Sequence, residues 1–286
     1  MTVTVRNPGR AMRRKLVNGV FVVFCALATL VALAALAAIL VSLVGQGIGG
    51  LDANIFKLST PAPGSVGGLA NAIKGSIMLC ALAMLIALFI GIFAGTWLAE
   101  YGGEGWYARI IRFVNDVLLS APSIVIGLFV YVLLVAPFHG FSGYAGAVAL
   151  AIIAIPVVTR TTEDVLKLQP TALRAAGIAL GAPVWTTIRK ILWKASLGGI
   201  VTGGLLAFAR ISGETAPLLL TALSNNFDSW DMSKPMANLP VVIFNFANSA
   251  YDDWRRLAWV GAILITAAVL AAQIIARILI REPKRS

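Results

Sequence analysis

Charged residues are scarce in this 286-residue sequence: only 12% of its residues are charged, whereas soluble domains carry about a quarter. Hydrophobic residues make up 59% of the chain, and the mean hydropathy is +0.89. This composition excludes an ordinary soluble domain and predicts an all-α, polytopic membrane protein with a single membrane domain. The formal net charge is +11, but the sequence contains no stretch in which Lys and Arg alternate with aromatic residues. We therefore predict no nucleic-acid partner and expect the basic residues to mark the cytoplasmic face.

Residues that bind metals or carry out catalysis are also rare. Cys25 and Cys80 both lie in apolar runs, which favours packing over a disulfide or a metal pair. The single histidine, His139, lies in a short polar turn without evident ligand partners. No Gly-x-x-x-x-Gly-Lys-Ser/Thr motif is present to cradle ATP phosphates, and no Gly-x-Ser-x-Gly nucleophile motif is present. We predict no catalytic residue, no metal and no cofactor in this chain.

Six apolar runs predict six transmembrane helices, with tails at 1–15 and 282–286 and a membrane domain at 16–281. The predicted spans are Leu16–Val44, Ile73–Ala99, Val117–Ala136, Ala145–Val158, Leu197–Leu223 and Leu257–Ile280. Gly91 and Gly95 have the spacing that lets membrane helices approach closely. Pro122 and Gly127 are the expected bend points of the third span. A mixed stretch at 239–250 predicts a helix along the outer surface.

Six spans place both termini on the same side, and the basic residues indicate which side that is. The inner segments then carry Arg6, Arg10, Arg13, Arg14, Lys15, Arg109, Arg112, Arg160, Lys167, Arg174, Arg189, Lys190, Lys194, Arg277, Arg281, Lys284 and Arg285. The outer segments carry only Lys57, Lys74, Lys234, Arg255 and Arg256. This bias predicts a multi-pass protein of the bacterial cytoplasmic membrane with both termini in the cytoplasm. The acidic pairs 163–164 and 252–253 are interpreted as solvated loop residues.

One long segment between two spans, residues 160–196, is too polar for lipid. Pro170 can open a helix there, Gly181 suits the left-handed residue that ends one, and Pro183 lies just beyond it. A second short helix is expected to follow, with apolar residues on one side and basic ones elsewhere. The segment therefore predicts two short helices around a turn, whose apolar face needs a partner other than lipid. The alternative is an amphipathic loop on the membrane surface.

The fifth span carries two charges, Arg210 and Glu214, deep in its apolar run. A charge at the bilayer centre costs about 2.5–3.5 kcal/mol on insertion scales. Four residues apart, the two can pair on one helix face, and Gly213 and Pro217 loosen the backbone beside them. We predict a polar path at a helix interface, and the alternative is an ion pair that only fixes helix packing.

The 160–196 segment resembles the coupling loop of ABC-importer permeases. That motif has Glu-Ala-Ala, a Gly six residues after the Glu and an Ile ten residues after that Gly. Here Gly181 and Ile191 match, Ala176 matches the first Ala, and Ala175 stands at the Glu position, so the acidic residue often seen at this docking surface is missing. Arg174 precedes the motif. Gly177 replaces the second Ala, and the usual Leu-Pro end is absent. The resemblance implies that this loop docks on an ATPase.

A second resemblance covers nearly all of the chain from residue 71 onward. The stretch Arg-Ile-Ser-Gly-Glu-Thr-Ala-Pro-Leu-Leu at 210–219, with 98–102, 121–127, 238–241 and 257–259, resembles the PstA family of permeases in bacterial phosphate ABC importers. It implies a type I, MetI-like fold and a non-catalytic subunit for inorganic phosphate. The substrate path is then assigned to Arg210, Ser212, Glu214 and Thr215.

The same resemblance implies the partners of the chain. These are a homologous PstC-like permease, two PstB-like ATPase subunits that bind ATP and Mg²⁺, an extracytoplasmic PstS-like phosphate-binding protein, and membrane lipid. Two alternatives remain open. One is a permease for another oxyanion, such as molybdate, sulfate or a phosphonate. The other is a polytopic membrane enzyme acting on lipid phosphates, which lacks a nucleophile or base cluster near Arg210 and leaves the coupling loop unexplained.

Overall fold

The computed structural model describes residues 8–279, and this part of the chain is helical without any strand. That confirms the predicted all-α class. The helices are α1 (Pro8–Gly47), α2 (Ala70–Glu100), α3 (Trp106–Ser120), α4 (Ser123–Val130), α5 (Gly143–Lys167), α6 (Thr171–Ala179), α7 (Val184–Thr187), α8 (Trp193–Ala195), α9 (Leu197–Ser212), α10 (Ala216–Thr221), α11 (Leu239–Ala247) and α12 (Asp252–Leu279). Two 3-10 turns, η1 (Ile48–Gly50) and η2 (Ala53–Phe56), and two π-helical turns, η3 (Tyr131–Val135) and η4 (Ile188–Leu192), complete the list.

Helix α5 lies at the centre of the bundle, because small residues on its neighbours let them approach it closely. A Cβ atom added at Gly91 of α2 would lie 2.7 Å from Val158 Cβ, and one at Gly95 would lie 2.5 Å from the carbonyl oxygen of Thr159. The predicted close-approach role of Gly91 and Gly95 is therefore confirmed. Helix α9 uses the same device on another side of α5, since a Cβ at Gly203 would lie 2.0 Å from Thr161 Oγ1.

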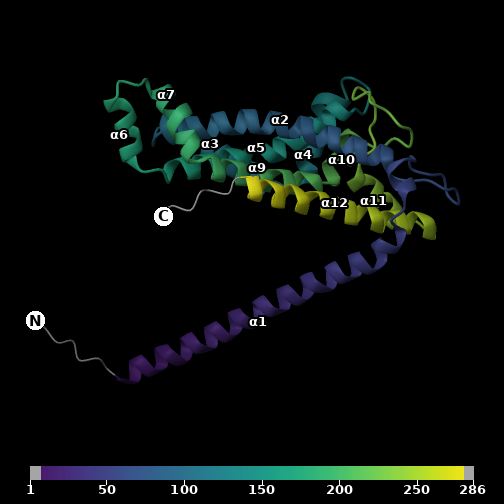
Figure 1. Ribbon diagram of the computed structural model, residues 1–286, viewed down its shortest axis with the longest axis horizontal. Coiled ribbons are helices and arrows are strands. Elements are labelled where there is room, and N and C mark those ends of the chain that lie inside the picture. The colour runs from purple at the N-terminus through teal and green to yellow at the C-terminus, as the bar shows by residue number, and fades with distance from the viewer. Residues whose placement is uncertain (1–7, 280–286) are drawn as a thin grey trace, which may run out of the picture.

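Helix α1 stands apart from this bundle (Figure 1), and almost all of its side chains are exposed. It contacts α12 only near its C-terminal end, where a Cβ at Gly47 would lie 2.3 Å from Ile263 Cδ1. Its length and apolar composition suit a membrane-spanning helix, in agreement with the first predicted span. The helix already begins at Pro8, so residues 8–15 of the predicted tail at 1–15 are helical and continue into the first apolar run. The predicted tail at 282–286 lies outside the described residues.

Within residues 8–279, four helices are long and apolar enough to cross a membrane, and the number becomes six if each of two bent pairs is one span. The first bent pair corrects the third predicted span, which was drawn as continuous from residue 117. Helix α3 ends at Ser120, and the chain then turns by 106° into α4 and η3. The residue before a proline avoids the helical region, and Ala121 is accordingly extended at ψ 137° before Pro122. Pro122 is thus a bend point, as predicted.

Gly127, the other expected bend point, lies inside α4 and serves a different purpose. A Cβ there would lie 2.6 Å from the Cα of Pro217, so the glycine lets α10 pack against α4. The fourth span also differs from its prediction, because α5 continues through Pro156 to Lys167. Residues 160–167 therefore form the C-terminal end of helix α5 and do not belong to a loop. The helix expected along the outer surface is α11; one of its faces packs against α12 and α2, with Val241 fully covered, and Phe244 on the other is half exposed.

Candidate functional site

The fifth predicted span is broken in the middle of its charged stretch. Helix α9 ends at Ser212, Gly213 and Glu214 lie outside any helix, and α10 begins at Ala216. Pro217 stands at the start of α10, where its missing N–H costs no intrahelical hydrogen bond. Non-helical backbone at membrane depth is tolerated where it is buried in protein or lines a water-filled cavity. The break therefore marks a candidate path through the protein.

Arg210 lies in the last turn of α9, where a positive charge is favoured by the helix dipole. The face of α9 that packs on the bundle carries Gly203, Ala207 and Ile211. Arg210 follows the exposed residues Thr202 and Leu206 at intervals of four, so it belongs to the face turned away from α5. Its side chain is partly exposed.

The structure corrects the predicted pairing of Arg210 with Glu214. Among the described residues, no ion pair joins these two side chains within 4.0 Å. The reason is the break at Gly213, because the (i, i+4) rule holds only while the helix continues. Glu214 and Thr215 lie beyond the break, and both are partly exposed.

Ser212 is not brought to the Arg210 side of α9. Two residues along an α-helix correspond to about 200° of rotation. The Ser212 hydroxyl donates to the Phe208 carbonyl at 2.6 Å. Both residues line an apolar cavity with Cys80 and Leu264, between α2, α9 and α12. The four residues predicted to form the substrate path therefore occupy two sides of the chain.

The segment predicted as a coupling loop forms the two short helices expected, α6 and the α7–η4–α8 run. Gly181 has φ +75°, which confirms its left-handed role. The Ala182 N–H donates to the Gly177 carbonyl at 3.1 Å, and the Gly181 N–H donates to the Ile178 carbonyl at 2.9 Å. These two bonds make a Schellman cap. Gly177 also fits closely, because a Cβ there would lie 2.5 Å from Thr187 Oγ1.

Arg174 joins α6 to the end of the bundle. Its Nε and Nη2 atoms lie 2.9 and 2.6 Å from the two carboxylate oxygens of Glu100, the last residue of α2. Its remaining donors reach the carbonyl oxygens of Leu166 and Gln169, both at 2.8 Å. The hydrogen bonds that the guanidinium donates to Glu100 raise the pKa of Arg174, so it stays charged. Arg174 is therefore the residue that positions α6.

An apolar surface remains uncovered on these short helices, at one end of the bundle (Figure 1). Leu180 is 86% exposed and Ile178 is 59% exposed, and Val184 lies nearby in the chain with half its surface uncovered. Ala175 and Ala176 are exposed as well, whereas Ile191 is partly buried. The inner side is filled by Ile188 and Leu192, which pack with Leu166. The outward apolar side chains make this end of the molecule a candidate contact surface for another protein.

A second buried carboxylate was not recognised from the sequence. Glu163 was interpreted as a solvated loop residue, but it lies in α5 with only 2% of its side chain exposed. Its Oε1 atom accepts from Arg112 Nε at 2.7 Å and from Lys167 Nζ at 2.6 Å. Lys167 stands four residues later on the same helix, a spacing that signals one of these contacts. Arg112 comes from α3, so the pair joins α3 to α5.

Known proteins resemble this chain over nearly its whole length. A family model described as "Binding-protein-dependent transport system inner membrane component" matches residues 87–285. A Yersinia pestis protein named "Phosphate transport system permease protein PstA" is 49% identical over 99% of both chains. A protein of the same name from Haemophilus influenzae is 54% identical over 86% of this chain and 87% of its own.

Solved structures show the same fold. The methionine ABC transporter MetNI, in an inward-facing conformation, contains a chain that superposes with a TM-score of 0.59 at 18% identity, over 74% of this chain and 96% of that one. This likeness establishes the MetI-like fold.

Proposed function

The chain belongs to the family of binding-protein-dependent transport system inner membrane components, and we propose that it is the membrane-spanning subunit through which an ATP-driven importer moves inorganic phosphate. It is a multi-pass inner-membrane transport subunit of the ABC-permease fold. Its near-full-length relatives from Yersinia pestis and Haemophilus influenzae are named phosphate permeases. At about 50% identity, that substrate is the best-supported one for this chain.

The observation that carries this proposal is the position of Arg210. It lies in the last turn of α9, beside a break in a membrane-spanning segment, on the face turned away from α5. A charge facing lipid there would be costly, so that face needs a partner subunit or a water-filled path. The planar guanidinium donates hydrogen bonds in a fork that matches the oxygens of phosphate.

The residues beyond the break complete the proposed path. Glu214 and Thr215 are partly exposed and follow Arg210 in the non-helical segment. Phosphate at neutral pH usually retains a proton, which a carboxylate can accept as a hydrogen bond, whereas a fully ionised sulfate offers none and is repelled. We assign Glu214 this selective role, since no ion pair holds it to Arg210 in this structure.

The uncovered apolar side chains on α6 and α7 support an ATPase as the cytoplasmic partner. Ile178, Leu180 and Val184 project from a loop that Arg174 joins rigidly to α2 and α5. ATP and Mg²⁺ are then bound by that separate subunit, and this chain is non-catalytic. We place α6 and both termini in the cytoplasm, as the distribution of basic residues favours. A homologous permease, two ATPase subunits and an extracytoplasmic phosphate-binding protein complete the proposed importer.

Replacing Arg210 with Lys tests the proposal, because the change keeps the charge and removes the fork. Losing a hydrogen bond to a charged ligand costs about 1.5–3 kcal/mol, so we expect phosphate uptake to fall about tenfold or more. Uptake is measured in membranes matched for protein level. The control is Arg255→Lys, at the exposed outer end of α12, which should transport normally. Equal uptake by the two variants would remove Arg210 from the phosphate path.

A further inference from the structure

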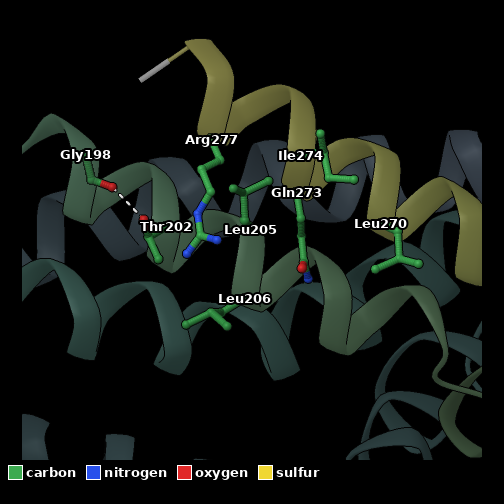
Figure 2. Close-up of a pocket in the computed structure, with 8 residues that line it drawn as sticks. All are labelled: Gly198, Thr202, Leu205, Leu206, Leu270, Gln273, Ile274 and Arg277. Atoms are coloured by element: carbon green, nitrogen blue, oxygen red, sulfur yellow. Dashed lines mark hydrogen bonds between the residues drawn. The ribbon is translucent and has the colours of Figure 1, made fainter. Parts of the chain in front are cut away.

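A groove of about 490 Å³ runs between α9 and α12, away from the break at Gly213. Figure 2 shows the side chains that line it, with those of Arg277, Gln273 and Leu270 descending from α12 toward α9. The lining residues are Gly198, Thr202, Leu205, Leu206, Leu270, Gln273, Ile274 and Arg277. None of these described residues is acidic, so the groove carries a net positive charge.

Polar and apolar groups occupy different parts of the groove. In Figure 2 the Arg277 guanidinium lies close to Thr202 at one end, and Leu270 lies at the other. The Thr202 hydroxyl already donates to the Gly198 carbonyl at 2.7 Å. The hydrogen-bond donors that remain for a ligand are therefore those of Arg277 and the Gln273 amide. The groove thus fits a molecule with an anionic head and an apolar tail.

The position of the groove along α12 identifies the membrane leaflet from which such a molecule would come. Helix α12 has 28 residues, so it is about 42 Å long and exceeds the ~30 Å hydrocarbon core of a bilayer. Arg277 lies in its last turn, at the level of the lipid headgroups. Its end of α12 is the cytoplasmic one, if the excess of basic residues marks the inner side.

We propose that this groove binds an anionic phospholipid of the cytoplasmic leaflet. The lipid phosphate contacts the Arg277 guanidinium and the Gln273 amide, as basic pockets between membrane helices do with lipid headgroups. One acyl chain lies against Leu206, Leu270 and Ile274. The walls favour a lipid over free phosphate, since Leu206 and Ile274 are exposed apolar side chains that a small hydrated anion would leave bare. Arg210 lies one turn beyond Leu206 on the same face of α9 and does not line this groove.

The test uses the full chain in its assembled complex, reconstituted in phosphatidylcholine vesicles. A small fraction of phosphatidylglycerol carries a photoreactive acyl chain, and a phosphatidylcholine probe with the same chain serves for comparison. Peptides that contain the groove residues of α9 or α12 should be labelled more strongly by the phosphatidylglycerol probe. Arg277→Gln should lower that labelling about fivefold, the effect of one basic residue near an anionic surface, and leave the phosphatidylcholine labelling unchanged.

Matched controls separate the groove from general effects. Arg109→Gln removes another basic residue that is counted as cytoplasmic and does not line this groove, so it should keep the headgroup preference. Ile274→Trp fills the groove and should block both probes. Ile275→Trp should block neither, because Ile275 is equally exposed, at 56% against 57%, but does not line the groove.

Four results would overturn the proposal. The first is equal labelling by the two probes. The second is an identical response of Arg277→Gln and Arg109→Gln. The third is competition by excess inorganic phosphate, which would assign the groove to the free anion. The fourth is an unlabelled groove in the assembled complex, which would show that a protein subunit covers it.

Discussion

At the scale of single residues, the ion pair between Arg174 and Glu100 connects the loop helix α6 to the bundle. Glu100 is only 7% exposed and receives two hydrogen bonds from the guanidinium. Such charge-assisted, bidentate hydrogen bonds are stronger than hydrogen bonds between neutral groups. Removing one partner leaves a mostly buried charge unsatisfied, which is the costly way to break such a pair.

Glu100→Gln should therefore destabilise the protein by about 2–3 kcal/mol, because the amide cannot accept both bonds from Arg174. The expected result is a lower melting temperature of the purified protein. Glu104→Gln is the matched control, since Glu104 is an exposed residue of the following turn, and it should melt like the unchanged protein. The role assigned to this pair is wrong if Glu100→Gln and Glu104→Gln melt at the same temperature.

The charged residues also show which roles of single residues could be predicted from the sequence and which could not. Arg210 was identifiable because a charge in a long apolar run is conspicuous and costly. Glu100 and Glu163 were not, since their arginine partners are 74 and 51 residues away in sequence. Local spacing can reveal an (i, i+4) contact such as Glu163–Lys167, but not a contact that depends on how α2, α3 and α5 pack.

At the scale of helices, glycine positions decide which helices approach closely. Gly91 and Gly95 place α2 against α5, and Gly203 places α9 against α5. Inside a membrane the hydrophobic effect does not drive helices together, so they associate through close van der Waals packing of their backbones. The spacing of Gly91 and Gly95 is visible in the sequence, and it led to the correct prediction.

Gly95→Val should separate α2 from α5. The new Cβ would lie 2.5 Å from the Thr159 carbonyl oxygen and 2.7 Å from Thr162 Cβ, and overpacking of this kind costs about 1–3 kcal/mol or more. We expect less protein in the membrane and a lower melting temperature in detergent. Gly19→Val in α1 is the control, because nothing lies within 4 Å of its added Cβ. Equal yield and melting of the two variants would contradict the packing described for α2 and α5.

Helix breaks were harder to predict than helix existence. Hydropathy is averaged over a window of residues and does not show where a helix bends or ends. The 106° turn at Pro122 and the end of α9 at Ser212 were therefore both placed inside continuous predicted spans. Pro122 and Gly213 were noted as weak points, but the extent of the bend depends on tertiary packing. The close approach of Gly127 to Pro217 is one contact that the sequence alone cannot specify.

At the scale of the whole molecule, the chain is built to be one part of an assembly. Helix α1 contacts the bundle only near its C-terminal end, α6 and α7 present uncovered apolar side chains, and Arg210 faces away from α5. These three features are costly for a chain alone, and the neighbouring subunits and lipid that we propose would satisfy them. The fold class and family were predictable from composition and motifs, whereas the surfaces that other molecules cover required the structure.

The most direct test of this account is ATP-driven uptake of labelled anions by vesicles that contain this chain with the proposed partner permease, ATPase and binding protein. The account predicts that labelled phosphate accumulates inside, that accumulation requires ATP, and that omitting this chain abolishes it. Labelled sulfate and molybdate, offered at the same concentration, should remain outside. Accumulation of sulfate or molybdate in preference to phosphate, or phosphate uptake that persists without this chain, would contradict the account.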